Sequence, residues 1–203
     1  MGNMTEAFRL RDEMAAFGLV PNVFTYNALI HGFCKEGNIS EAFKLKFEMI
    51  ANGFKPDVVT YNLLINGLCK HGWISEAFEL HDEMIRKALV PDKFTYTELI
   101  YVLCKKRKTQ EAHELFLKMQ RDGLCVDHVA YNILIKIYFK ESKPHEALKL
   151  YEEMAERGLL TTTPIQNVLI DGLGKKGTVQ EFHKMHNEMV LKGFVSGSDA
   201  YSG

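Results

Sequence analysis

The sequence has almost no net charge. Its 203 residues include 25 Lys and Arg against 26 Asp and Glu, which gives a formal charge of −1. This balance excludes the general basicity of many nucleic-acid-binding proteins, so a nucleic acid would have to meet a local row of cations. Long apolar runs are also missing, so we expect no membrane partner. The sequence shows no signal or transit peptide, and we expect none in this chain.

Cysteine is scarce, and its spacing argues against the usual cysteine sites. The four residues are Cys34, Cys69, Cys104 and Cys125. No two of them form a C-x-x-C element, which argues against a zinc site. The first three recur every 35 residues, and equivalent residues of stacked helices lie ~8–10 Å apart, beyond the ~7 Å Cα limit for a disulfide. We therefore expect reduced, buried thiols.

Signatures of catalysis are missing as well. A deaminase-type zinc site needs an H-x-E element together with C-x-x-C, and this set does not occur. No acidic cluster indicates a metal-dependent nuclease. We therefore predict that the chain is not an enzyme and that it has no catalytic residue, metal, cofactor or small-molecule substrate.

What the sequence does contain is a repeat of 35 residues. Segments 23–57 and 58–92 are identical at 21 of 35 positions without a gap. A fixed period of this size predicts an array of stacked structural units. The clearest marker of the period is a Lys that returns at Lys35, Lys70, Lys105, Lys140 and Lys175. We predict a single array over residues 1–203: a partial repeat (1–22), five full repeats (23–57, 58–92, 93–127, 128–162 and 163–197) and the start of another (198–203).

Each repeat is predicted to form two short helices. One apolar face of the first helix, at the spacing i, i+3, i+4, i+7, comprises Tyr61, Leu64, Ile65 and Leu68. Asn38-x-x-Glu41 has the form of a capping box that starts the second helix. Helices of about three turns are unstable alone in water, so they must pack on one another and on the next repeat. The expected fold class is all-α, an α-solenoid of helix-turn-helix repeats.

Four positions of the repeat recur outside this apolar core: an apolar residue at the second position, the polar residue after the Tyr, the Lys, and the last residue of the repeat. The polar position after the Tyr and the Lys lie ~12 Å apart along the first helix and about 80° apart around it, so both face one side. A flat apolar group, a polar pair and a cation could meet the base face, the base edge and the phosphate of one nucleotide of single-stranded RNA.

These positions give three sets of candidate residues. The base-reading set is Asn27, Asp57, Asn62, Asp92, Thr97, Asp127, Asn132, Thr162 and Asn167, with Gly197 ending the last repeat. The base-stacking set is Phe24, Val59, Phe94, Val129 and Pro164. The phosphate-binding set is Lys35, Lys70, Lys105, Lys140 and Lys175.

Each set also has a structural explanation that stays open. Asn in a first turn often bonds to local backbone, Asp before a helix is a favoured N-cap, and Lys near a helix C-terminus is favoured by the dipole. The alternative function is a protein-binding scaffold of the tetratricopeptide type. That repeat has 34 residues and a W-x-x-L-G-x-x-Y pattern, whereas this chain has 35 and a single Trp73 outside that context.

The segment VTYNLLINGLCKHGWISEAFELHDEMIRKALVPD resembles the motif of the pentatricopeptide repeat (PPR) family. The match continues in register over essentially the whole chain, and NALIHGFCKEGN is similar to the plant P-type, restorer-of-fertility-like branch. The resemblance implies a right-handed superhelix and sequence-specific binding of RNA, with one base per repeat. It also implies a role in organellar RNA processing, stabilisation or translation, further RNA-processing proteins as partners, and a mitochondrial location, with the chloroplast as the alternative.

The resemblance further implies that the polar pair of each repeat selects the base. A carboxylate accepts hydrogen bonds, so Asp suits the N3–H of uracil or the N1–H of guanine. The pairs are Asn27 with Asp57 and Asn62 with Asp92, which resemble the uracil pair; Thr97 with Asp127, which resembles the guanine pair; Asn132 with Thr162, which indicates a pyrimidine; and Asn167 with Gly197, which departs from the motif. We predict a core target of 5′-UUG-pyrimidine-3′.

Overall fold

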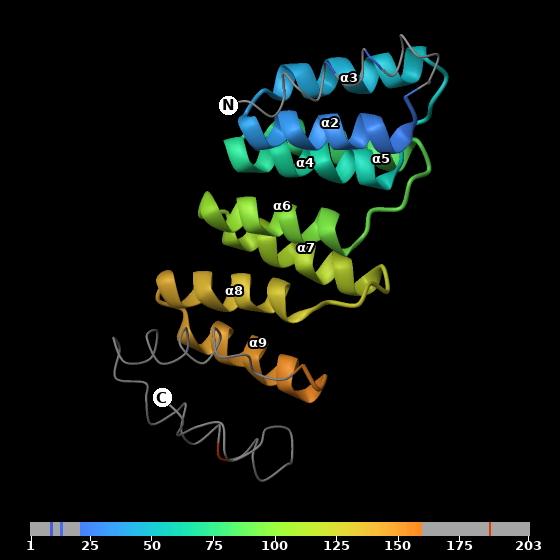
Figure 1. Cartoon of the computed structure of the whole chain (residues 1–203). Coiled ribbons are helices and arrows are strands. Elements are labelled where there is room, and N and C mark those ends of the chain that lie inside the picture. The colour runs from blue at the N-terminus through green and yellow to red at the C-terminus, as the bar shows by residue number, and fades with distance from the viewer. Residues whose placement is uncertain (1–8, 10–12, 14–20, 160–186, 188–203) are drawn as a thin grey trace. The chain divides into compact units, whose positions relative to one another are not determined.

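The structure is a computed structural model that describes residues 9, 13, 21–159 and 187. All regular structure in this part of the chain is helical (Figure 1). The helices of segment 21–159 are α2 (Val23–Glu36), α3 (Ile39–Ala51), α4 (Val58–His71), α5 (Ile74–Arg86), α6 (Lys93–Lys105), α7 (Thr109–Arg121), α8 (His128–Lys140) and α9 (Pro144–Glu156). The prediction of an all-α helical repeat fold is confirmed.

The helices follow the 35-residue period of the sequence. The first helices α2, α4, α6 and α8 begin at Val23, Val58, Lys93 and His128, which are the residues that open the repeats. Contacts group the chain into two compact units, residues 1–102 and 103–203, called here the N-terminal half and the C-terminal half. The boundary falls within α6, and each half is described by itself.

Capping of the first helices follows from the residue just before each of them. The side chain of Asn22 accepts a hydrogen bond from Thr25 N at 3.0 Å, and that of Asp57 accepts one from Thr60 N at 2.9 Å; both form capping boxes. At the other end, Gly37 and Gly72 adopt the left-handed conformation that closes α2 and α4.

The capping box expected at the second helix is wrong. Asn38 is the N-cap of α3, but its side chain makes no capping hydrogen bond. Its backbone (φ −86°, ψ 63°) lies outside the extended region that a capping side chain normally needs. The acidic Glu41 still lies in the first turn, where a negative charge is favoured by the helix dipole.

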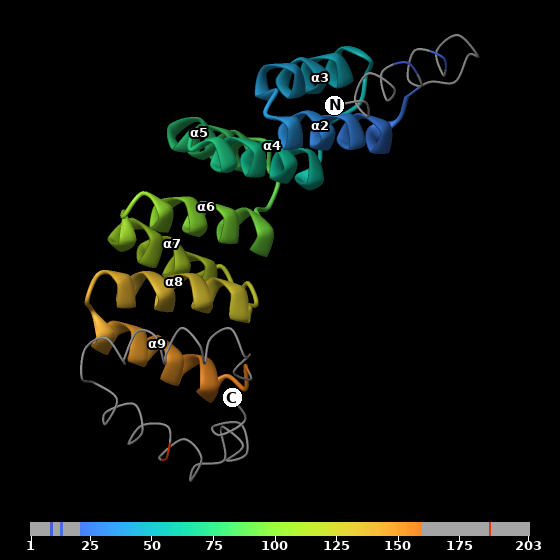
Figure 2. The same cartoon turned by 60° about the vertical axis from the view of Figure 1, so that its left-hand side comes forward.

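In the N-terminal half the first helices pack side by side. α2 lies against both α3 and α4, and α4 against α5, as Figures 1 and 2 both show. The predicted apolar face of α4 is at this contact: Tyr61, Leu64, Ile65 and Leu68 are at most 1% exposed. Burial of each such side chain stabilises the fold by about 1.5–3 kcal/mol, which these short helices could not obtain alone.

A buried Tyr links the two helices of a repeat. Tyr61 donates a hydrogen bond through its hydroxyl to Glu83 Oε1 at 2.7 Å, and Tyr131 does the same to Glu153 at 3.0 Å. Both Tyr side chains are buried, and a buried phenol needs such a partner. The same hydrogen bond, between residues 22 positions apart, therefore joins the two helices of a repeat in both halves.

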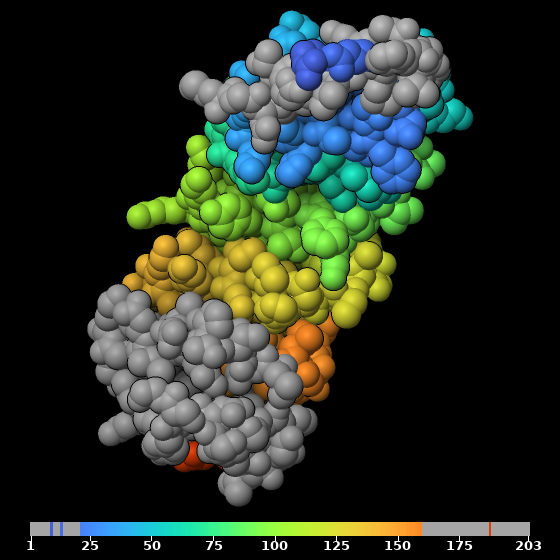
Figure 3. Space-filling view, viewed as in Figure 1, coloured from blue at the N-terminus to red at the C-terminus, as the bar shows by residue number. Residues whose placement is uncertain are grey.

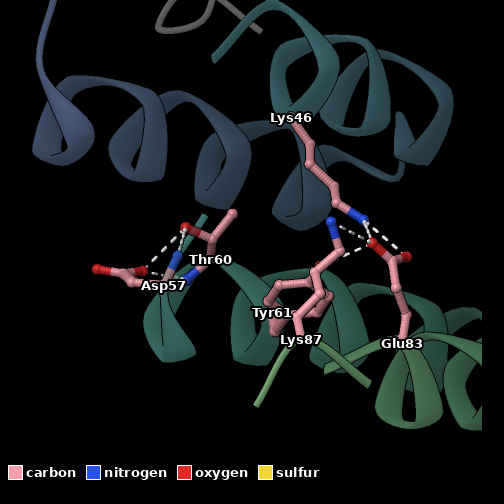
Figure 4. Close-up of polar contacts among 6 residues, drawn as sticks. All are labelled: Lys46, Asp57, Thr60, Tyr61, Glu83 and Lys87. Atoms are coloured by element: carbon pink, nitrogen blue, oxygen red, sulfur yellow. Dashed lines mark hydrogen bonds and ion pairs between the residues drawn. The ribbon is translucent and has the colours of Figure 1, made fainter. Parts of the chain in front are cut away.

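A buried ion pair joins two successive repeats in the N-terminal half. Lys46 of α3 is 2% exposed, and its Nζ lies 2.9 Å from both Oε1 and Oε2 of Glu83 on α5 (Figure 4). Nζ also lies 4.8 Å from the centre of the Tyr61 ring. The Lys46 charge is thus held from two sides, by a carboxylate and by an aromatic face.

In the C-terminal half, α8 packs against α7 and α9. Thr109, at the start of α7, donates a hydrogen bond to Glu141, at the end of α8. Tyr138 and His113 are joined by a hydrogen bond of 2.8 Å between the phenol oxygen and Nδ1. Polar contacts between consecutive repeats therefore exist in this half too, although with different residues.

Three of the four thiols lie in the core. Cys34, Cys69 and Cys104 are buried and unbridged, as expected, whereas Cys125 is exposed, which differs from the expectation. Burial raises the pKa of Cys34 to about 11 and of Cys69 to about 12, so both stay protonated at neutral pH. In the described segments no helix is both long enough and apolar enough to span a bilayer.

The buried ion pair makes a prediction about stability. Glu83→Gln should lower the free energy of unfolding by roughly 1–3 kcal/mol, because Lys46 loses its charge partner while it stays buried; the partial exposure of Glu83 reduces the cost from the ~3–5 kcal/mol of a fully buried pair. Urea unfolding measures the change. The matched control is Glu41→Gln, which breaks an exposed pair with Lys44 and should cost under about 1 kcal/mol. Equal losses in the two variants would contradict this account.

The same carboxylate predicts a pH dependence. Burial alone would raise the pKa of Glu83, but hydrogen bonds from Lys46 and Tyr61 outweigh it and hold that pKa below its ordinary value of 4.5. The stabilisation is therefore complete above pH ~4.5 and is lost as pH falls through the lowered pKa. The stability difference between the wild type and Glu83→Gln should be constant from pH 7 to 5 and shrink below pH 4.5. A difference that shrinks between pH 7 and 5 would refute the lowered pKa.

Candidate nucleic-acid interface

The structure brings the first predicted polar pair together. Asn27, on α2, donates a hydrogen bond from Nδ2 to Asp57 Oδ1 at 3.3 Å. Its other end, Oδ1, accepts a hydrogen bond from the hydroxyl of Thr60 at 2.7 Å. Asn27 is therefore bonded to the last residue of its own repeat and to Thr60 of the next repeat, rather than to local backbone, which was the structural alternative for this position.

The second pair repeats this arrangement. Asn62 Nδ2 lies 3.0 Å from both Oδ1 and Oδ2 of Asp92, and Asn62 Oδ1 accepts a hydrogen bond from the hydroxyl of Thr95 at 2.6 Å. Both residues of this pair are half-buried, whereas Asn27 is only 8% exposed. Two successive repeat junctions thus carry the same three-residue cluster of Asn, Asp and Thr.

The Asp of the first pair caps a helix and keeps one oxygen free. Asp57 Oδ1 accepts hydrogen bonds from the backbone N–H of Thr60 at 2.9 Å (Figure 4) and from Asn27 Nδ2. It also lies 2.9 Å from the Thr60 hydroxyl oxygen, whose single proton has a shorter contact, of 2.7 Å, with Asn27 Oδ1. Asp57 Oδ2 makes no hydrogen bond with the described residues. Burial alone would raise the pKa of Asp57, but these hydrogen bonds outweigh it and hold the pKa below 3.8. The free oxygen is therefore an acceptor at neutral pH.

The structure describes only some of the remaining base-reading residues. Thr97, on α6, is half-buried, and Asp127 caps α8 by accepting a hydrogen bond from Val129 N at 3.0 Å. Thr97 belongs to the N-terminal half and Asp127 to the C-terminal half. Asn132 Oδ1 is buried and has no hydrogen-bond partner in segment 21–159. The predicted residues outside the described part are Thr162, Pro164, Asn167, Lys175 and Gly197.

The predicted stacking residues are exposed in both halves. Phe24 is 82% exposed, Val59 53%, Phe94 63% and Val129 41%, although large apolar side chains are usually buried. Lys93 Nζ lies 5.4 Å from the centre of the Phe94 ring. Figure 3 shows that α2, which carries Phe24, lies at the surface of the N-terminal half. These positions offer flat or branched apolar surface to solvent at the start of every described first helix.

The Lys row is exposed and available. Lys35, Lys70, Lys105 and Lys140 each lie in the last turn of a first helix. All four are exposed, and none forms an ion pair with another residue in the described segments. The helix dipole favours a cation there, so the structural explanation holds, and the charges remain free to meet an anion.

Sequence reasoning missed the Thr that holds each Asn. Thr60 and Thr95 are the third residues of their helices, and both are fully buried. The signal was present in the sequence, since a Thr also stands at Thr25, one period earlier. The sequence alone does not distinguish this role, because a Thr in the first turn of a helix also fits a capping box.

Comparison with known families identifies the repeat. A sequence model described as "PPR repeat family" matches residues 1–35, 21–70, 56–105, 95–136 and 126–164, and a model described as "PPR repeat" matches residues 167–194. No curated protein gives a significant sequence match.

Solved structures show the same architecture. The pentatricopeptide repeat protein PPR10 in complex with an 18-nt psaJ RNA element is 26% identical with a TM-score of 0.70, over 85% of this chain and 24% of that one. PPR10 from maize is 26% identical with a TM-score of 0.59, over 99% of this chain and 34% of that one. The PPR domain of Arabidopsis thaliana protein-only RNase P 1, in complex with tRNA, is 17% identical with a TM-score of 0.68, over 85% and 91%, and shows the fold alone.

The family models together cover almost the whole chain. This chain belongs to the PPR repeat family.

Proposed function

We propose that this chain binds single-stranded RNA and reads one base with each repeat. The observation that carries the proposal is the Asn–Asp pair, which forms in the same way at two successive repeat junctions. PPR10, which is 26% identical, is bound to an 18-nt RNA element; this chain covers 24% of it. The function proposed here concerns this segment.

The chemistry of the pair supports a uracil in the first repeat. Asp57 is ionised at neutral pH and its Oδ2 makes no hydrogen bond with the described residues. It can therefore accept a hydrogen bond from the N3–H of uracil, whereas the N3 of cytosine carries no hydrogen and is itself an acceptor. Asn27 Nδ2 uses one N–H on Asp57, and its second N–H can donate to a base carbonyl. Asn62 with Asp92 offers the same groups to the next base.

The other two sets support the rest of a nucleotide. Phe24, Val59, Phe94 and Val129 present exposed apolar surface on which bases can stack, at about 1–3 kcal/mol per base. The exposed Lys lies at the C-terminal end of each first helix, whereas the apolar residue lies at its start. The Lys could therefore bind the phosphate of a nucleotide whose base stacks on the apolar residue. Phosphate contacts position a chain without specifying its sequence, so the Lys row contributes affinity and the polar pairs contribute selectivity.

The proposed core target remains 5′-UUG-pyrimidine-3′, with the RNA running 5′ to 3′ along the protein from N to C. Guanine is assigned to Thr97 with Asp127, because the shorter Thr leaves room for a purine and Asp accepts the N1–H of guanine. Nothing in the described segments assigns a catalytic role to the chain. By resemblance to the restorer-of-fertility-like branch, we propose a mitochondrial role in RNA processing, stabilisation or translation.

Base selectivity at the third position tests the guanine assignment. Short RNAs that differ only at the third base of the core should bind best with G, by roughly threefold to tenfold over A, C and U, the range expected for one or two hydrogen bonds. Fluorescence anisotropy at fixed salt measures the affinities. Equal affinity for all four bases would refute the Thr97 assignment and leave RNA binding itself intact. Failure to bind any RNA would refute the proposed function and favour the protein scaffold.

The Lys row predicts a salt dependence. Replacement of Lys35, Lys70, Lys105 and Lys140 by Gln should weaken binding to every RNA sequence alike and should lower the slope of log K against log salt, by about 0.7 per lost phosphate contact on a single strand. The matched control replaces the exposed Lys44, Lys87, Lys108 and Lys143, which lie outside the predicted face and pair with Glu residues. Equal slopes in both variants would show that the row does not bind phosphate.

A further inference from the structure

We propose that the buried Thr at the third position of a first helix positions the Asn of the preceding repeat and so contributes to base discrimination by that repeat. The residues are Thr60 for Asn27 and Thr95 for Asn62. This inference rests on the proposed RNA binding and deepens it. Both Thr side chains are fully buried, so they act through Asn rather than by contact with a base.

The argument begins with the two ends of the Asn amide. One end accepts hydrogen bonds and the other donates them. The Thr60 hydroxyl donates a hydrogen bond to Asn27 Oδ1 at 2.7 Å, and the carboxylate of Asp57 accepts one from Asn27 Nδ2 at 3.3 Å. If the amide turned over, Oδ1 would face the carboxylate and two acceptors would oppose each other. The hydroxyl and the carboxylate together therefore select one orientation, and it aims the remaining N–H of Nδ2.

The second junction has the same geometry. The Thr95 hydroxyl donates to Asn62 Oδ1 at 2.6 Å, and Asn62 Nδ2 donates to Asp92 at 3.0 Å. These hydroxyl contacts are shorter than the amide contacts beside them in both clusters. The same hydroxyl oxygens lie 2.9 Å from Asp57 Oδ1 and 3.1 Å from Asp92 Oδ1. Because a hydroxyl donates one proton, we assign that proton to the shorter contact, with the Asn oxygen.

An independent observation comes from a reading Asn that has no Thr at the matching position of the next repeat. The residue 33 positions after Asn132 is Ile165, where Asn27 and Asn62 have Thr60 and Thr95. Ile has no hydroxyl, and Asn132 Oδ1 is a buried atom that has no hydrogen-bond partner among the described residues. A buried acceptor without a donor carries a free-energy cost, so this Asn is held less firmly. The sequence and the structure thus change together at this repeat.

Thr60 also takes part in a capping box, and the two roles can be separated. Its Oγ1 accepts a hydrogen bond from Asp57 N at 3.2 Å. Thr25 makes the same box with Asn22, and within the described residues its side chain hydrogen-bonds only to Asn22. Thr25→Val therefore removes the cap hydroxyl without removing a partner of a reading Asn, which makes it the matched control.

The experiment uses the whole 203-residue chain and short RNAs with U or C at the first or the second base of the core. Thr60→Val should reduce the preference for U over C at the first base by about threefold to tenfold, the contribution of one hydrogen bond, and leave the second base unchanged. Thr95→Val should do the reverse. Thr60→Ser keeps the hydroxyl and should restore the preference, and Thr25→Val should change neither base. Circular dichroism melting establishes that each variant is folded.

Two results would overturn the inference while RNA binding stands: a Thr60→Val protein with wild-type discrimination at the first base, or one that loses affinity for U and C alike. Either would limit Thr60 to a capping role. If Thr60→Val does not fold, Thr95→Val supplies the same comparison at the second base. Wild-type protein that binds RNA with no preference for U at either base would refute the base assignments themselves, which distinguishes failure of the proposed function from failure of the Thr role.

Discussion

The carboxylate at the end of a repeat is the group on which the rest of the arrangement depends. Asp57 caps α4 through Thr60 and at the same time receives the side chain of Asn27 from α2. A single side chain therefore sets both the start of α4 and its polar contact with α2, the first helix of the preceding repeat. Because both uses fall on one oxygen, the second remains free on the surface that we assign to RNA.

The stability and the proposed selectivity of the array are separated in space. Stability comes from buried Tyr residues, from the apolar faces of first helices and, in the N-terminal half, from the ion pair of Lys46 with Glu83. The proposed reading face consists of exposed apolar groups, half-buried polar pairs and exposed Lys at the same helices.

Much of the fold could be predicted from the sequence, because the 35-residue repeat is visible as identical residues at a fixed interval. The interval of 35 residues and the i, i+3, i+4, i+7 pattern gave the helices, their order and the buried face of α4. The choice of capping residues was less accessible. Asn38 matches a capping box by sequence, but its backbone conformation does not let the side chain reach the helix, and conformation at a single residue is decided by the packing around the turn.

Sequence by itself determined which residue types recur at which phase, and hence that Asn27, Asp57 and Lys35 belong to one repeated set. It left open whether Asn bonds to local backbone and whether Asp only caps a helix. The tertiary structure decided both, because partners 30 and 33 residues apart meet only when one repeat packs on the next. It also showed the role of Thr60, since a hydroxyl can bond to several neighbours and only packing selects among them.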